Sequence, residues 1–321
     1  RTNFHLCLKD QVTFDFTTHN VHRGLSNRVD QCVGHGARVK VRKSGIERFG
    51  AQNFLPRSRM EFIRNGILPV IVDNPSDQQA GAGMTDAFRQ GEEHAADVRA
   101  ILGPGTALTY GADWTEYANY RPADGTGDVL FHLDPLWADP NIDAIGIDNY
   151  MPLADWREGF DHADARAGFA SPCDPAYLRA NVAGGELHDW FYASPADREG
   201  QVRTPIRDTA HGEDWVFRLK DLRAWWENPH HDRPGGVRAA APTAWVLRSK
   251  PLRFTELGCP AIDKGMNQPN VFLDPKSAES VTPHFSLGRR DLAVQRAYLE
   301  AVLAYWRESG EYVVFEAPAV V

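Results

Sequence analysis

The first 109 residues of this chain contain no tyrosine and no tryptophan, although the sequence has nine of each. These two residue types first appear at Tyr110 and Trp114. The front of the chain also differs in charge: residues 1–64 carry 12 Lys and Arg against 5 Asp and Glu, whereas the formal net charge of the chain is −8. These differences predict an atypical N-terminal segment over residues 1–84, followed by a domain over residues 85–321. We expect residues 1–64 to pack poorly against the rest and to be cut first by proteases.

Other absences exclude classes of protein. No run of 18 apolar residues occurs, so no membrane-spanning helix is expected, and the start of the chain lacks the basic-then-apolar pattern of a secretory signal. The net charge of −8 argues against general nucleic-acid binding, which usually requires a basic surface. There is no GxSxG, no P-loop and no GxGxxG placed after a strand. The sequence therefore predicts no membrane span, no nucleic-acid partner and no cofactor.

Cysteine is scarce, and histidine forms no convincing metal site. The four cysteines are widely spaced and form no CxxC pair, which predicts free thiols in a reduced compartment; they are Cys7, Cys32, Cys173 and Cys259. The run His230-His231-Asp232 contains metal-ligating residue types. Adjacent histidines rarely bind one metal, however, and no third ligand has suitable spacing. We interpret this run as a polar loop and expect no metal.

Short apolar runs alternate with helical patterns along most of the chain. Strands are predicted at 11–17, 37–41, 67–72, 107–112, 142–147, 252–255 and 312–315, and helices at 85–102, 174–183, 215–226 and 290–307. Such alternation predicts a parallel sheet with crossover helices. Residues just past the strand ends line the active face of a barrel. We therefore expect the strands that end at Asp113, Asp148 and Glu256 to be parallel and to open onto one face.

The sharpest chemical signal is the segment Arg253–Gly258 (RFTELG), in which an apolar strand ends at Glu256. Glycoside cleavage needs two carboxylates that flank the scissile bond, one as the acid and the other as the nucleophile or base. Glu256 is therefore the candidate catalytic residue. The alternative is a strand-end Glu paired with an arginine, such as Arg253 or Arg248.

Two further strand ends carry residue types suited to sugars. Carboxylates can bond sugar hydroxyls, and aromatic planes can stack on sugar rings. The candidate substrate-binding residues are Asp113, Trp114, Glu116, Asp148, Asn149 and Tyr150. The alternatives are that Trp114 plugs the barrel mouth, that Asp148 caps a turn and that Tyr150 belongs to the core. Glu186 and Glu213 are lower-ranked candidates for the second carboxylate, because neither follows an evident strand.

Six stretches and the closing helix together resemble a known family. They include YGADWTEY, DVLFHLDPLWADPNIDAIGIDNYMPLADWREG, NVAGGELHDWFYASP and APTAWVLRSKPLRFTELGCPAIDKGMNQPNVFLDPKSAES. Over about residues 95–307 the chain resembles the TIM-barrel-like domain of gene transfer agents, found in their tail host-specificity protein and in related phages. The resemblance implies an α/β fold of the (β/α)8 TIM-barrel-like type, here incomplete at the N-terminal strands and at the last strand. It also implies a glycoside-hydrolase-like site with Glu256 as the nucleophile.

The same resemblance sets expectations for the biology. It implies bacterial envelope polysaccharide or peptidoglycan and other tail proteins as partners, and a chain that is cytoplasmic before assembly and then part of a virion-like particle tail. Family members carry a Gly-Ser-Glu-Leu-type segment whose Glu is the expected acid/base, whereas residues 79–84 read QAGAGM here. Hence the alternative is a non-catalytic structural or carbohydrate-binding tail-tip module. Because that acid is missing, we expect little or no hydrolysis, with sugar binding retained through Trp114 and Tyr150.

Overall fold

Three parallel strands form the centre of the fold. In the computed structural model, which describes residues 3–5, 12–17, 68–71, 95–273 and 280–309, these strands are neighbours in the order β4-β5-β8. The strands are β4 (Thr109–Asp113), β5 (Ala144–Asn149) and β8 (Leu252–Leu257). All six residues of β5 are buried, as expected for a strand with a neighbour on each side and both faces covered.

Glycine allows β5 to approach β4 closely. A Cβ atom on Gly146 would collide with the backbone carbonyl oxygen of Tyr110. The residue of β4 that pairs with Gly146 is Gly111. The two glycines thus stand opposite each other where the first two parallel strands meet.

Three further strands extend the sheet beyond β4. They are β1 (Asn3–His5), β2 (Val12–Thr17) and β3 (Leu68–Ile71). The sheet order is β3-β2-β1-β4-β5-β8; β1 is antiparallel to both β2 and β4, and β2 and β3 are parallel. The predicted strands at 11–17 and 67–72 are confirmed. The predicted strands at 37–41 and 312–315 lie outside the described residues.

The expectation of a (β/α)8 barrel is met only in part. The described residues form a mixed α/β domain with a parallel sheet, and no closed barrel is seen among them. The antiparallel strand β1 departs from an all-parallel barrel, because in a (β/α)8 barrel every neighbouring pair is parallel. A strand next to β4 with reversed direction could not be predicted from its own three residues.

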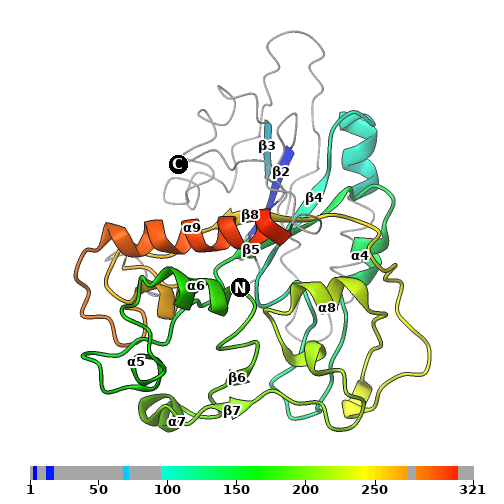
Figure 1. Cartoon of the computed structure of the whole chain (residues 1–321). Coiled ribbons are helices and arrows are strands. Elements are labelled where there is room, and N and C mark those ends of the chain that lie inside the picture. Colours follow the sequence, from blue (N-terminus) through cyan, green and yellow to red (C-terminus); the bar gives the residue numbers. More distant parts are fainter. Residues whose placement is uncertain (1–2, 6–11, 18–67, 72–94, 274–279, 310–321) are drawn as a thin grey trace.

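Helices cover the sheet. The long helix α9 (Leu292–Ser309) crosses β5 and β8 in Figure 1. It buries a stripe spaced four residues apart, Val294, Tyr298, Val302 and Trp306. The Trp306 ring lies edge-on to Phe254 of β8, with centroids 6.2 Å apart. This amphipathic stripe is the one that the sequence predicted over 290–307.

The segment between β5 and β8 spans residues 150–251 and holds only short elements. They are α5 (Ala163–Arg166), α6 (Pro175–Val182), β6 (Trp190–Phe191), α7 (Pro195–Gly200), β7 (Thr204–Pro205), η1 (Asp214–Phe217), α8 (Leu222–Glu227) and η2 (Pro234–Gly236). The predicted helix at 174–183 is confirmed as α6. The predicted helix at 215–226 is broken into η1 and α8, because the Asp221 carboxylate accepts the backbone N–H of Ala224 and starts a new helix there.

Between β4 and β5 the chain forms a loop and then α4 (Asp134–Ala138). That loop packs against the 150–251 segment: the Tyr117 hydroxyl donates to the Leu219 carbonyl at 2.7 Å, and Asn119 donates to Val216 at 2.8 Å. The fully buried ring of Trp225 lies 5.2 Å from the Tyr117 ring. The loop after β4 and the 150–251 segment are therefore packed against each other. At residues 95–102 the described part of the predicted helix 85–102 is helical.

Candidate functional site

The carboxyl ends of β4, β5 and β8 bring three acidic residues into one row. Asp113 pairs with Asp148 across β4 and β5, and Asp148 pairs with Glu256 across β5 and β8. The prediction that these strand ends open onto one face is confirmed. Neighbouring strands lie about 4.8 Å apart, so the Cα atoms of Asp113 and Glu256 are separated by about 10 Å.

A β-bulge sets the position of Glu256. Ile147 pairs with Phe254, but the next residue, Asp148, pairs with Glu256, which leaves Thr255 as the extra residue on β8. The Thr255 hydroxyl donates to the Asp148 carboxylate at 2.6 Å. Bulges occur often beside active sites because they redirect a side chain at a strand end. Thr255 thus fixes the register that places Glu256 opposite Asp148.

Glu256 is held by an aromatic hydroxyl. The Tyr150 Oη donates to Glu256 Oε2 at 2.7 Å. Burial, and then the charge of Glu256, raise the pKa of Tyr150 well above its usual value, so this hydroxyl remains a donor at neutral pH. The Phe272 ring lies edge-on to Tyr150 with centroids 6.0 Å apart and is 45% exposed. A carboxylate, its donor and an exposed aromatic face therefore stand together.

Glu116 provides a carboxyl group of a different kind. It follows β4 in a turn closed by its own backbone N–H, which donates to the Asp113 carbonyl at 2.8 Å. Burial, and then the negative charge of Asp113, raise the pKa of Glu116 from 4.5 to about 7. A carboxyl group whose pKa is raised toward neutral pH can hold the proton that a general acid donates.

The buried Tyr110 is acted on by the negative charges at and after the ends of β4 and β5. Its pKa is raised well above the usual value by burial and then by the charges of Glu116 and Asp148. Asp148 also raises the pKa of Tyr150. Asp148 thus acts on both Tyr110 and Tyr150.

The remaining predicted residues have more local roles. Trp114 is 7% exposed and belongs to the core cluster, which favours the alternative of a buried plug. The Asp113 carboxylate accepts from the backbone N–H of Thr115 at 2.8 Å, so it caps the turn after β4. Asn149 is 3% exposed and accepts the backbone N–H of Met151 at 3.0 Å. The structure therefore brings together Asp148, Tyr150 and Glu256. Glu116 lies after β4 and interacts with Asp113, and the other three residues have supporting positions.

Several alternatives can now be decided. Arg248 pairs with Glu227 at 2.7 Å, so it is not the partner suggested for Glu256. Glu186 accepts from Arg198 at 3.1 Å. Glu213 forms ion pairs with Arg233 and Arg238 at 2.7 and 2.9 Å, so both lower-ranked carboxylates serve as structural anchors.

The run His230-His231-Asp232 lies in a loop, as interpreted, but His230 points into the core and not to the surface. This side chain is fully buried and stacks on Trp245 and Phe131. Its Nδ1 lies 2.9 Å from the Asp134 carboxylate, and its Nε2 lies 2.8 Å from the Trp225 carbonyl oxygen. The surrounding aromatic residues could not be read from the polar run itself.

Sequence reasoning missed three residues of the site. Thr255 lies beside Glu256 in the same motif, but a bulge has no reliable sequence signal. Tyr110 reads simply as a residue of an apolar strand. Phe272 is far from Tyr150 along the chain, so only the fold could show that the two rings meet.

Within the described ranges, no group of three His, Cys, Asp or Glu side chains could hold a metal ion. Cys173 and Cys259 are free thiols, and burial raises the pKa of Cys259 to about 12. In the part of the chain that the structure describes, no helix is both long and apolar enough to cross a membrane.

The fold and this row of carboxyl groups define an α/β domain with an acidic site at the carboxyl ends of parallel strands. The model of the GTA (gene transfer agent) TIM-barrel-like domain matches residues 77–318, and the chain belongs to this family. The resemblance identified from the sequence is thereby confirmed. No curated protein matches the chain.

Proposed function

We propose that this chain is a glycoside-hydrolase-like module of a gene transfer agent particle, acting on bacterial envelope polysaccharide or peptidoglycan. The observation that carries the proposal is the hydrogen bond of 2.7 Å from Tyr150 to Glu256 at the carboxyl end of β8. That bond orients the Glu256 carboxyl group. Family membership supports the particle, in which tail proteins would be the partners, with a cytoplasmic stage before assembly.

In this proposal the two carboxyl groups divide the chemistry of glycoside cleavage. Glu256 is the carboxylate that acts on the anomeric carbon, either directly or through a water molecule, and Glu116 donates the proton to the leaving oxygen. The raised pKa of Glu116, about 7, supports its role as the donor. Tyr150 and Asp148 position Glu256 and the sugar, and Phe272 adds an aromatic face at the mouth of the site.

Glu116 changes what the missing Gly-Ser-Glu-Leu-type segment implies. In this chain residues 79–84 take the place of that segment and contain no Glu, so the sequence alone offered no proton donor there. These residues lie outside the described part of the chain. Glu116 was expected only to bind substrate. Its burial and its proximity to Asp113 support a second role as the acid. With Glu116 as the proton donor, the chain would be able to cleave glycosidic bonds.

The test is release of reducing ends from purified bacterial envelope glycans and from peptidoglycan sacculi. We expect the chain to cleave at least one of them. Glu256→Gln should abolish cleavage, and Glu116→Gln should lower kcat by about 10²–10⁴-fold, as is usual when a general acid is lost. Glu186→Gln, which changes a carboxylate paired with Arg198, is the matched control and should retain the wild-type rate.

A second function, non-catalytic glycan binding, is favoured by the absence of the Gly-Ser-Glu-Leu-type segment. It predicts that the chain binds the same glycans without cleaving them. Binding that is equal for the wild type and Glu256→Gln, with no product in either case, would establish it. Absence of both binding and cleavage would refute both functions.

A further inference from the structure

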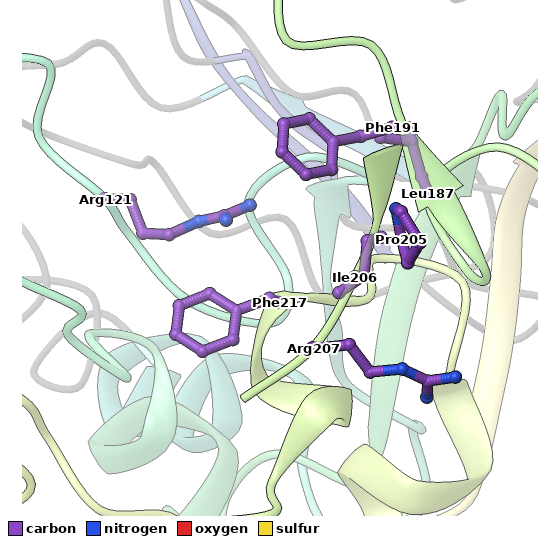
Figure 2. Close-up of a pocket in the computed structure, with 7 residues that line it drawn as sticks. All are labelled: Arg121, Leu187, Phe191, Pro205, Ile206, Arg207 and Phe217. Carbon is purple, nitrogen blue, oxygen red and sulfur yellow. The ribbon is translucent and has the colours of Figure 1, made fainter. Parts of the chain in front are cut away.

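A separate cavity of about 310 Å³ lies between the loop after β4 and the segment between β5 and β8. Figure 2 shows Arg121 and Phe217 on one side of it, with Phe191 above and Ile206 and Pro205 across from them. Leu187 and Arg207 complete the lining. Ligand pockets range from about 300 to 1,000 Å³, so this one has room for a small ligand such as a single sugar unit.

The walls are mainly apolar and aromatic. Ile206 is 5% exposed, whereas the Phe191 ring is 38% exposed and available to a ligand. None of the described residues that line the cavity carries a carboxylate. Such a surface suits a ring with one apolar face, because aromatic side chains stack on such faces.

Arg121 supplies the charge. Its guanidinium carbon lies 5.9 Å from the centroid of the Phe217 ring. Within the described residues, no carboxylate pairs with this guanidinium. Arg207, in contrast, is bound to Asp214 at 2.9 Å. Arg121 is therefore the cation in the lining that remains available for an anion.

A short stretch of chain connects the cavity with the proposed catalytic residue Glu116. Arg121 follows Glu116 by five residues, so their Cα atoms are at most about 17 Å apart. Its other walls come from β6, β7, η1 and Leu187, in the segment that lies beyond the carboxyl ends of the strands. A polymeric substrate that lies over the carboxyl ends could therefore place another of its units here.

We propose that this cavity is a binding subsite for an acidic sugar unit, whose ring packs on Phe191 and Phe217 and whose anionic group binds Arg121. This inference rests on the proposed function and specifies its substrate class as an acidic glycan. A carboxylate and a phosphate are both recognised by a guanidinium, so the shared chemistry is a negatively charged substituent on a sugar.

The test is calorimetric titration of the full chain with four small ligands, two acidic and two neutral, at low salt. They are digalacturonic acid, its dimethyl ester, which has the same rings without charge, and galactose 6-phosphate with galactose as its neutral control. We expect at least one acidic ligand to bind about tenfold more tightly than its neutral counterpart. The pair that shows the difference identifies the charged group as a carboxylate or a phosphate.

Variants locate the subsite. Arg121→Gln should abolish the preference for the acidic ligand, and Arg121→Lys should retain part of it. Phe217→Leu should weaken binding of the acidic and neutral ligands alike. Arg166→Gln, on an arginine that is 62% exposed and paired with Asp161, is the matched control and should change nothing. An unchanged melting temperature for each variant verifies that it folds.

The proposal is overturned if no acidic ligand is preferred, or if the preference survives in Arg121→Gln. These results are independent of the hydrolysis assay. Cleavage of envelope glycans without any acid preference would leave the proposed function intact and remove the subsite. Absence of glycan binding and cleavage, together with an Arg121-dependent acid preference, would refute the proposed function and leave a site for acidic sugars.

Discussion

At the scale of single residues, the site depends on a difference between two carboxyl groups. Glu256 accepts a hydrogen bond from Tyr150, whereas Glu116 is partly buried beside the like charge of Asp113. Burial and the neighbouring negative charge favour the neutral form of Glu116. Both residues were identified from the sequence, but the hydrogen bond to Glu256 and the burial of Glu116 depend on contacts that only the fold provides.

The raised pKa of Glu116 makes a prediction about stability. Between pH 4.5 and about 7 the folded protein retains a proton that the unfolded chain releases, so the free energy of unfolding should fall as the pH rises through this window. Glu116→Gln removes this loss. The variant should melt close to the wild type at pH 4 and above it at pH 8, by roughly 2–4 °C for each kcal/mol gained. Tryptophan fluorescence melts across pH 4–8 measure this.

The control for Glu116 is Glu158, whose pKa is shifted in the opposite direction. The hydrogen bond and charge of Lys264 lower the pKa of Glu158, so its contribution to stability is present above pH 4.5 and is lost as the pH falls. Glu158→Gln should therefore give no gain at pH 8. Equal melting curves for wild type and Glu116→Gln at every pH would show that Glu116 has an ordinary pKa.

At the scale of elements, a buried polar group holds distant parts of the long 150–251 segment together. Lys220 is 1% exposed, and its Nζ donates to the carbonyl oxygens of Pro152 and Gly184 at 2.7 Å each. It thereby ties the start of the segment to the end of α6. Burial lowers the pKa of Lys220 to about 7.

Lys220→Met should destabilise the protein by about 2–4 kcal/mol at pH 9, because two buried carbonyl groups lose their donor. The loss should be smaller at pH 6. Folded Lys220 is neutral above about pH 7, whereas the unfolded chain binds a proton up to about pH 10.5, so wild-type stability gains from this residue as the pH rises. Urea unfolding at the two pH values tests this. An equal loss at both would show that the amine is not buried as described.

The elements also show what could be predicted from the sequence. The parallel strands β4, β5 and β8 were found because each is an apolar run that ends in a polar residue, and α9 was found from its apolar stripe. The bulge at Thr255 and the direction of β1 were not found, because both are set by pairing with distant strands. The break between η1 and α8 was missed because the aromatic pattern continues across Asp221.

At the scale of the whole molecule, one core connects the strands with the segment beyond their carboxyl ends. Trp225 of α8 contacts Tyr117 after β4 and Trp245 before β8, with centroids 5.2 and 5.1 Å apart. Its Nε1 also donates to the Ala118 carbonyl at 3.1 Å. The family resemblance predicted the barrel-like class, but a closed barrel is not seen in the described residues, and the predicted weak packing of residues 1–64 falls almost entirely outside them.

This continuous core predicts cooperative unfolding. Melting curves from tryptophan fluorescence and from far-ultraviolet circular dichroism should coincide. Trp225→Ala should lower both midpoints together and destabilise the protein by about 3–5 kcal/mol. Two separated transitions, only one of them sensitive to Trp225→Ala, would show that the 150–251 segment is an independent domain.

The separation of β5 and β8 along the chain also constrains how the protein folds. About 100 residues must be closed into a loop before these two strands can pair, which costs about 4 kcal/mol of chain entropy. During synthesis β5 emerges long before β8, and its open edge is a template for pairing with other chains. Folding yield should therefore depend on how fast the intervening segment collapses onto β4 and β5 and returns β8 to that edge.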